Sequence, residues 1–367
     1  MKKYILLLSA ILLFIVPFSV KAANPAKEKY EEFTARFEQI KEYDDITKNR
    51  FTIIKGQVFS EIFESFGDEP VTFVPALDRK YNRMAVFIVD GSNKIVFKTH
   101  QLETNYQIPG EVRQPTKEIA AVSFLDVNGD NKKDIILITR CRKKDENDGL
   151  RKYKVGDVLY QMEGGFYRDY RTSEKINRFS MNKSAKSIIS FVRDGKSTEF
   201  LYTATTSKEL LDNDFDIINE QCYPRNFEKL GKLQVIPGTY SMGDYAVFMI
   251  YLVNDRGDIV WSFQPMGEYD NLYSLRGITC KDVDGDGMKD IIVLARYSCE
   301  SPQGELLVES ACSVYYQRTG GFVEDVEFKK HFVCSDQHKL DDVVREIRKF
   351  WGWYIDELPN YEEKIYD

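Results

Sequence analysis

The chain repeats part of itself once, with an offset of 156 residues between the best-matched segments. A match of this length, with its segments in the same order, is not an accident of composition, and it is typical of a duplicated structural unit. The fold is therefore expected to contain two similar halves. The matching pairs are residues 73–76 with 235–238, 85–89 with 246–250 (both with a few residues of slippage), 124–138 with 280–294, and 158–166 with 314–322.

Each copy is expected to consist mainly of strands. Its β-branched and aromatic runs are bounded by Gly, Asn and Asp, a pattern typical of strands joined by tight turns. Residues 90–94 and 254–258 carry the Gly and Asn that hairpin turns need, and residues 163–165 and 319–321 repeat this device. In the first copy the expected strands are 71–74, 84–89, 95–98, 119–125, 135–139, 158–162 and 166–170.

Helices are expected at the ends of the copies. One helix capped by Asn182 and stopped by Gly195 has apolar residues at helical spacing. A longer amphipathic helix is expected after Ser335 or Asp336 near the C-terminus. Residues 30–40 carry aromatic and apolar side chains in a charged background, which predicts a third helix near the N-terminus.

Two short acidic loops carry the clearest chemical signal. They read DVNGDNKKD and DVDGDGMKD, with oxygen-bearing side chains at positions one, three, five and nine. Calcium prefers six to eight oxygen ligands at about 2.3–2.6 Å, and a tightly wound loop with alternate carboxylates can supply them. A main-chain carbonyl at position seven would complete each set. The predicted ligands are Asp126, Asn128, Asp130, Lys132 and Asp134 in the first loop, and Asp282, Asp284, Asp286, Met288 and Asp290 in the second.

The residues between the ligands and after the loops indicate which calcium motif this is. Gly129 and Gly285 permit a sharp turn, and Asn131 and Gly287 can adopt a left-handed conformation. Position twelve is apolar in both loops, whereas an EF-hand carries an acidic residue there and enters a helix. Each loop is therefore expected to join two strands. The alternative is a pair of acidic turns that hold no metal.

The second loop is expected to bind calcium more tightly than the first. It gathers four carboxylates within nine residues, and these repel one another strongly without a cation. In the first loop Asn128 replaces one carboxylate, and Lys132 and Lys133 lower the negative charge.

The loop and the Gly-Gly-Phe hairpin that follows it resemble the FG-GAP and VCBS repeats of integrin-α-like β-propellers. The resemblance covers roughly thirty residues in each copy. In that family the loop links two strands of a blade and holds a structural calcium ion. Because the loops lie 156 residues apart, far more than one blade, each half is expected to carry one family-like blade joined to a degenerate one.

The predicted fold is mainly β and internally duplicated, with β-propeller-like sheets, a helix closing each half and an N-terminal helix. Residues 1–23 have a basic start, an apolar run and small residues at the end, which predicts a secretory signal peptide. A retained membrane anchor is the alternative. Residues 24–200 form the expected first half, with calcium loop 126–134, and residues 201–367 the second, with loop 282–290.

The charge and the cysteines agree with export. The formal net charge is −7, and it becomes −10 without Lys2, Lys3 and Lys21. Such acidity argues against a nucleic-acid partner, and no second long apolar stretch predicts an integral membrane segment after signal cleavage. Six cysteines allow up to three disulfides in a secreted or periplasmic protein, and Cys299 with Cys312 is the favoured pair. Zinc is the disfavoured reading because there is no CxxC pair.

No catalytic motif accompanies these features. The expected function is that of an exported, calcium-stabilised binding or interaction protein of the cell envelope, with an envelope protein or a glycan as its partner. The alternative is a calcium-stabilised hydrolase of envelope or extracellular polymers that uses two carboxylates in a cleft. On the C-terminal helix, Trp351 is expected to dock against the fold and Trp353 to point away from it.

Overall fold

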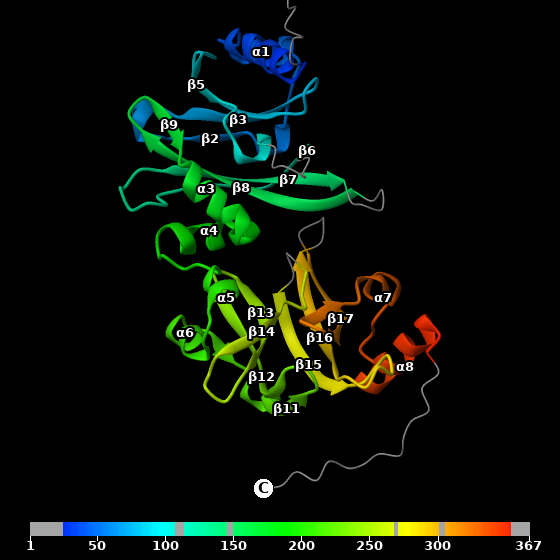
Figure 1. Ribbon diagram of the computed structural model, residues 1–367. Coiled ribbons are helices and arrows are strands. Elements are labelled where there is room, and N and C mark those ends of the chain that lie inside the picture. The colour runs from blue at the N-terminus through cyan, green and yellow to red at the C-terminus, as the bar shows by residue number, and fades with distance from the viewer. Residues whose placement is uncertain (1–24, 107–113, 145–149, 268–270, 301–304, 354–367) are drawn as a thin grey trace, which may run out of the picture.

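The computed structural model describes residues 25–106, 114–144, 150–267, 271–300 and 305–353. Over these ranges the chain is mainly β and forms four antiparallel sheets (Figure 1). The sheets form no closed barrel or propeller within the described ranges. None of the helices in the same ranges is both long enough and apolar enough to cross a membrane.

The first half is a stack of four layers: helices, a five-stranded sheet, a four-stranded sheet and more helices (Figure 1). Its elements are α1 (Pro25–Glu38), α2 (Tyr43–Lys48), β1 (Phe51–Ile53), β2 (Phe59–Glu61), β3 (Val71–Asp78), β4 (Met84–Val89), β5 (Ile95–Thr99), β6 (Gln114–Leu125), β7 (Asp134–Lys144), β8 (Leu150–Met162), β9 (Gly165–Arg168), α3 (Tyr170–Arg178) and α4 (Ala185–Val192).

The second half has the same layers in the same order. In Figure 1 they run from left to right, whereas those of the first half run from top to bottom. Its elements are α5 (Phe200–Thr203), α6 (Ser207–Asp212), β10 (Asp216–Ile217), β11 (Tyr223–Phe227), β12 (Gly231–Met242), β13 (Tyr245–Val253), β14 (Ile259–Phe263), β15 (Asn271–Lys281), β16 (Asp290–Glu300), β17 (Leu306–Arg318), β18 (Gly321–Glu324), α7 (Val326–His331) and α8 (Leu340–Trp351).

Strand pairing is duplicated in detail. The five-stranded sheets have the orders β1-β3-β4-β5 and β10-β12-β13-β14, with β2 and β11 pairing beside them. The four-stranded sheets are the meanders β6-β7-β8-β9 and β15-β16-β17-β18. Even single bonds recur: Ile54 N donates to Pro75 O at 3.0 Å, and Ile218 N donates to Pro237 O at 2.9 Å. The repeat seen in the sequence therefore extends over both sheets of each half.

Apolar side chains fill three interfaces in each half. Between the two sheets of the first half lie Phe73, Ile88, Ile135 and Leu159, and between the sheets of the second lie Phe248, Ile250, Ile291 and Val293. The outer face of each five-stranded sheet packs against α1 and α2, or against α5 and α6. The outer face of each four-stranded sheet packs against α3 and α4, or against α7 and α8. Strands that are buried on both faces explain the nearly continuous apolar runs of β4 and β13.

The helix boundaries differ from the predicted ones. Ser184, not Asn182, caps α4, because its hydroxyl accepts a hydrogen bond from Ser187 N at 3.1 Å. Helix α8 begins after Lys339, whose N–H is bound by the Asp342 carboxylate. Tyr170 begins α3 instead of ending a strand, since Asp169 caps that helix. Short helices α3, α5, α6 and α7 lack enough residues to show a helical period in the sequence.

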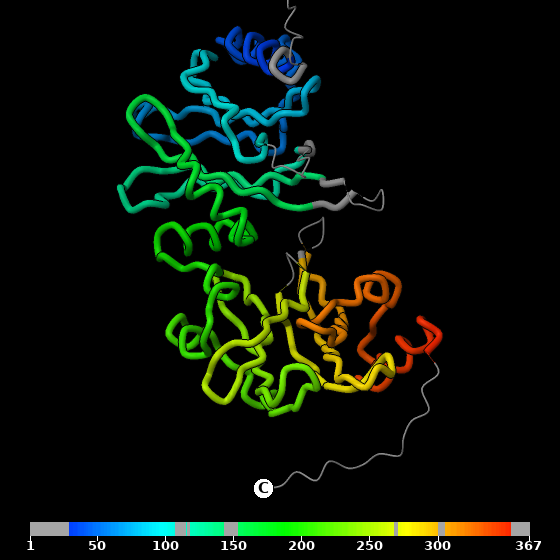
Figure 2. Tube along the Cα trace, in the orientation of Figure 1, coloured from blue at the N-terminus to red at the C-terminus, as the bar shows by residue number. Residues whose placement is uncertain are grey.

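The two halves contact each other through α4 and the hairpin between β12 and β13. Ser187 Oγ donates to Met242 O at 3.2 Å, and Ser184 Oγ donates to Asp244 Oδ1 at 2.5 Å. A Cβ atom on Gly243 would lie 2.8 Å from Ser187 N, so this hairpin turn needs glycine. Figure 2 follows the chain from α4 directly into α5 at this junction.

The expected disulfide between Cys299 and Cys312 is wrong for this strand register. Cys299 pairs with Leu307 and Cys312 with Leu294, five residues away along the ladder. That offset corresponds to about 17 Å, beyond the Cα separation of roughly 7 Å that a disulfide can span. Cys312 instead neighbours Cys334, whose thiol, together with burial, raises the pKa of Cys312.

Candidate functional site

Both acidic loops join the first two strands of a four-stranded sheet, as the sequence predicted. The first loop connects β6 to β7, and the second connects β15 to β16. Position two of each loop, Val127 or Val283, is fully buried in the apolar layer beneath the helices. This buried valine holds each loop at the edge of its sheet.

Main-chain N–H groups orient the carboxylates of the first loop. Asp126 Oδ1 accepts from Gly129 N at 2.7 Å, and its Oδ2 accepts from Asn131 N at 2.9 Å. Asn128 Oδ1 accepts from Asp130 N, and Asp130 Oδ1 accepts from Lys132 N. Gly129 and Asn131 have φ of +83° and +63°, which confirms the predicted left-handed positions.

The second loop has the counterparts of these four hydrogen bonds. Asp282 Oδ1 and Oδ2 accept from Gly285 N at 2.7 Å and Gly287 N at 2.9 Å. Asp284 and Asp286 accept from the N–H groups two residues further on, the second of which belongs to Met288. Gly285 and Gly287 have φ of +80° and +81°. Two loops with different sequences thus hold their oxygens in the same arrangement.

The ninth residue of each loop is the buried anchor. Asp134 accepts from Val127 N and Gln161 N, and Asp290 accepts from Val283 N and Gln317 N, all at 2.8–3.0 Å. Burial raises the pKa of Asp134 and raises that of Asp290 to about 7. A cation beside these carboxylates would offset the cost of burying their charge.

Carboxylates of the second loop converge on one point. Ligand oxygens from Asp282, Asp284 and Asp290 lie within 4.8 Å of one another, as expected of groups that could share a metal ion. Arg318 reaches the rim of this cluster, with Nη2 2.7 Å from Asp284 Oδ2 and Nη1 3.0 Å from Asp286 Oδ2. The residue at the matching position of the first copy is Met162. The second loop therefore has an arginine at its rim where the first copy has a methionine.

A polar brace that sequence reasoning missed ties each loop to the neighbouring five-stranded sheet. In the first half, Glu64 Oε2 accepts from Gln161 Nε2 at 2.8 Å and from Lys133 N at 3.4 Å. In the second half, Glu228 Oε2 accepts from Gln317 Nε2 at 3.1 Å and from Lys289 N at 2.8 Å.

Charge strengthens the brace in the second half. Although burial favours a higher pKa, hydrogen bonds from the side chain and the main-chain N–H of Lys289 lower the pKa of Glu228 to about 2. The repeated glutamines could have been found from the VLYQ and VYYQ matches, whereas the glutamates stand in dissimilar segments.

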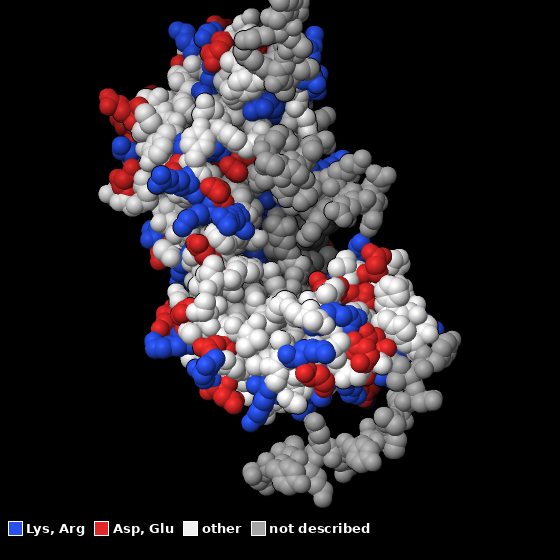
Figure 3. Space-filling view, in the orientation of Figure 1, with Lys and Arg blue, Asp and Glu red and all other residues white. Residues whose placement is uncertain are grey.

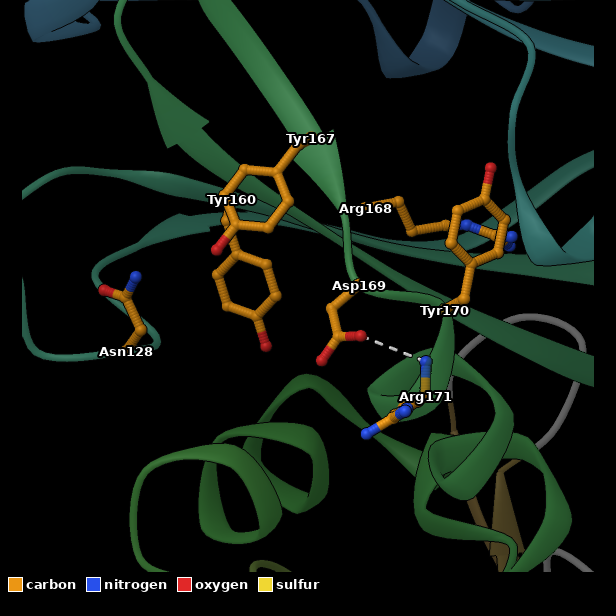
Figure 4. A pocket seen from close by; sticks show the side chains of 7 residues that line it. All are labelled: Asn128, Tyr160, Tyr167, Arg168, Asp169, Tyr170 and Arg171. Carbon is orange, nitrogen blue, oxygen red and sulfur yellow. Dashed lines mark hydrogen bonds between the residues drawn. The ribbon is translucent and has the colours of Figure 1, made fainter.

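An open pocket of about 480 Å³ lies beside the first acidic loop (Figure 4). Its wall includes Asn128, Tyr160, Tyr167 and Asp169. The Tyr160 and Tyr167 rings lie 5.4 Å apart, centre to centre, and the Asp169 carboxylate stands next to them in Figure 4. Sequence reasoning missed this pocket because its residues come from a loop, two strands and a helix start.

A buried arginine fixes the far wall of this pocket. The Arg168 guanidinium packs against both the Tyr106 and the Tyr170 ring, 4.5 and 4.2 Å from their centres. Its Nη1 is 3.0 Å from Glu103 Oε2 and 3.6 Å from Asp157 Oδ1. Tyr170 is therefore held in place although half of its surface is exposed.

Asp157 gives the fold a pH dependence that can be tested. This side chain is fully buried, and burial raises its pKa to about 7, even though its Oδ1 accepts from Glu103 N. A carboxyl with a raised folded-state pKa stabilises the protein at pH values below its unfolded pKa, and this contribution is lost as the pH rises through the folded pKa. From about pH 4 to 7, the wild type should lose up to about 1.4 kcal/mol per pH unit relative to Asp157→Asn.

Urea unfolding of both proteins across this pH range measures the effect. The exposed Asp255→Asn variant is the control, because Asp255 lies in a solvent-facing hairpin turn. A wild-type profile parallel to that of Asp157→Asn would contradict the assignment.

No known family model matches the chain, and no curated protein matches it. Among the predicted ligands, the structure gathers the side chains of each loop into one turn. It does so for Asp126, Asn128, Asp130 and Asp134, and for Asp282, Asp284, Asp286 and Asp290, while Lys132 and Met288 contribute N–H groups to the turns.

Proposed function

We propose that the protein is an exported, calcium-stabilised binding protein of the cell envelope, with one calcium ion in each acidic loop. The observation that carries this proposal is that main-chain donors orient the oxygen-bearing side chains in the same way in both loops, and that three carboxylates of the second loop converge on one point. A hydrogen-bonded carboxylate oxygen keeps a second lone pair for a metal. Calcium tolerates such ligand sets better than magnesium, which demands near-ideal octahedral geometry.

The position of the loops supports a relation to FG-GAP and VCBS repeats, in which such a loop links two strands of a blade. Each four-stranded meander, β6 to β9 or β15 to β18, has its acidic loop between its first two strands and a Gly-Gly hairpin between its last two. We therefore propose one propeller-like blade of this family type in each half. In this proposal the five-stranded sheet of each half takes the place of a degenerate neighbouring blade.

The proposed partner is an envelope protein or a glycan, bound in the periplasm or outside the cell. Acidic and basic side chains are interspersed on the face shown in Figure 3, and the net charge is negative. This distribution offers no support for binding to a polyanion. Export rests on the signal-peptide pattern of residues 1–23.

Calcium titration of the mature protein by calorimetry tests the metal assignment. We expect two sites, with Asn128→Ala removing the first and Asp284→Ala the second. Extracellular calcium modules commonly have dissociation constants of about 10⁻⁴ to 10⁻³ M, so millimolar titrant is needed. Asp255→Ala, which removes a carboxylate from a hairpin turn, is the matched control. Wild-type protein that takes up no calcium would end the proposal.

Arg318 makes a further prediction about the second loop. A bound cation competes with the guanidinium for Asp284 and Asp286, so Arg318→Met, which restores the residue of the first copy, should raise calcium affinity. The side chain is partly exposed, and a screened charge of this kind contributes roughly 1 kcal/mol, or about fivefold in affinity. Calcium titration of Arg318→Met in the Asn128→Ala background isolates the second site. Unchanged or weaker binding there would show that Arg318 does not compete.

The hydrolase alternative gains no specific support from the described pockets. The pocket beside the first loop presents one carboxylate, that of Asp169, and this group already caps α3. Turnover of a polymer panel by the mature protein would nevertheless favour the enzyme over the binding protein.

A further inference from the structure

In the second half, tryptophans of the chain itself fill the place that corresponds to the open pocket of the first half. Trp351 Nε1 donates to Asp325 Oδ2 at 2.7 Å, and Tyr316 donates to the same oxygen at 2.6 Å. The Trp353 ring stands edge-on to Tyr316 with 5.7 Å between centres and stacks with Trp351. Trp353 was expected to point away from the fold, and the structure corrects this: it packs against Tyr316.

The first half has the same tyrosine and aspartate but not the tryptophans that contact them. At the offset of 156 residues, Tyr160 corresponds to Tyr316 and Asp169 to Asp325, and both aspartates cap the following helix. Trp351 corresponds to Gly195. Helix α4 ends at Val192, and the left-handed Gly195, with φ of +69°, leads the chain away toward α5.

The vacated place is the pocket of about 480 Å³. Its volume lies within the range of about 300–1,000 Å³ that is common for small-ligand sites. Thr172 Oγ1 donates to Asp169 Oδ2 at 2.6 Å and so takes the role of the Tyr316 hydroxyl. The place of the Trp351 indole, which donates the other hydrogen bond in the second half, is taken by the pocket.

Aromatic side chains replace aliphatic ones around the opening. Tyr167 and Tyr170 stand where the second half has Val323 and Val326, and both are about half exposed. Tyr167 lies over Tyr160, while Arg168 holds Tyr170 from behind (Figure 4). Held aromatic rings around a carboxylate favour a flat ring that carries a hydrogen-bond donor on its edge.

We propose that this pocket binds an indole ring, with the ring against Tyr160 and Tyr167 and its N–H donated to Asp169. The ligand supplies from outside the group that the second half supplies from α8. It comes either from free tryptophan-like molecules or from a tryptophan side chain of a protein partner, which share this chemistry. The inference rests on the proposed role as a binding protein but does not require calcium.

Binding of two probes to the mature protein tests the proposal and separates the two sources. Free tryptophan represents the free ligand, and N-acetyl-tryptophanamide, whose two amides mimic the peptide bonds of a chain, represents the protein partner. Saturable binding of either one, by calorimetry or ligand-observed NMR, is expected with a stoichiometry of one. N-acetyl-phenylalaninamide, which has a ring without the N–H, should bind roughly fivefold more weakly or not at all.

Two variants place the binding in the pocket. Tyr167→Val installs the residue of the second half and should weaken probe binding about threefold or more. Asp169→Asn keeps a helix-capping side chain while removing the charged acceptor, and should weaken binding about fivefold. Tyr273→Val, at an equally exposed tyrosine of the second half, should leave binding unchanged.

Several results would overturn the indole proposal. Absence of saturable binding by both probes at millimolar concentration overturns the proposal, as does binding that Tyr167→Val and Asp169→Asn leave unchanged. Binding of a monosaccharide such as N-acetylglucosamine in place of the indole probes would overturn it in favour of a glycan site. Calcium titration of the same samples keeps the two ideas apart: protein that binds calcium but no indole refutes this inference alone.

Discussion

Calcium is expected to raise the melting temperature of chelator-treated mature protein by about 5–10 °C. At a hundred times the dissociation constant, each site contributes about 2.7 kcal/mol of stability. For domains of 150–250 residues, 1 kcal/mol corresponds to a shift of about 2–4 °C. The effect is large because each loop joins the edge strand of its four-stranded sheet to the neighbouring central strand, so that unfolding must release the ion.

Variants divide this shift between the loops. Asn128→Ala and Asp284→Ala should each remove about half of the calcium-induced shift, and the double variant should remove nearly all of it. Asp255→Ala controls for the loss of a carboxylate at a turn. Thermal scans with calcium, magnesium and chelator provide the measurement. An equal response to magnesium, or none to calcium, would contradict structural calcium sites.

Gly321→Ala is expected to destabilise the second half by about 2–4 kcal/mol. A Cβ at this position would lie 2.1 Å from the Trp261 ring, which packs from the neighbouring five-stranded sheet. Overpacking of this kind costs roughly 1–3 kcal/mol, and the φ of +143° adds strain of about 1 kcal/mol for a residue with a side chain. The close approach explains why the second position of the Gly-Gly hairpin is a glycine.

Gly320→Ala is the matched control, because its φ is also positive, at +100°, but no atom lies within 4 Å of the added Cβ. It should cost only the backbone strain of about 1 kcal/mol. The first half offers a second comparison. A Cβ added at Gly165 would lie 2.7 Å from Phe97, whereas a Cβ added at Gly164 would have no atom within 4 Å. Urea midpoints of the four variants measure the differences. Equal losses at Gly320 and Gly321 would show that Trp261 moves aside freely.

Local patterns predicted the strands and the loops well. All seven strands expected in the first copy are present, and the hairpins at residues 90–94 and 254–258 join β4 to β5 and β13 to β14. These features depend on neighbours in sequence, since period-two alternation and Gly or Asn turns are short-range signals. The left-handed Asn131 and Gly287 were predicted for the same reason.

Contacts between distant segments were not predictable in this way. The braces of Glu64 with Gln161 and of Glu228 with Gln317 join residues 97 and 89 positions apart. Cys334 beside Cys312 depends on the turn that follows α7, and the Cys299 pairing failed because strand register is set by whole-sheet packing.

The duplication, the strand content and the oxygen-bearing side chains of the two turns are specified by residues close along the chain, so sequence patterns alone predict them. The contact of Arg318 with Asp284 and Asp286 depends on three-dimensional packing, and so do the cover of Asp325 by α8 and the cavity that α4 leaves beside Asp169. The two copies therefore differ beside Asp169 and Asp325, where helix length and packing, not the repeated motif, control what fills the space.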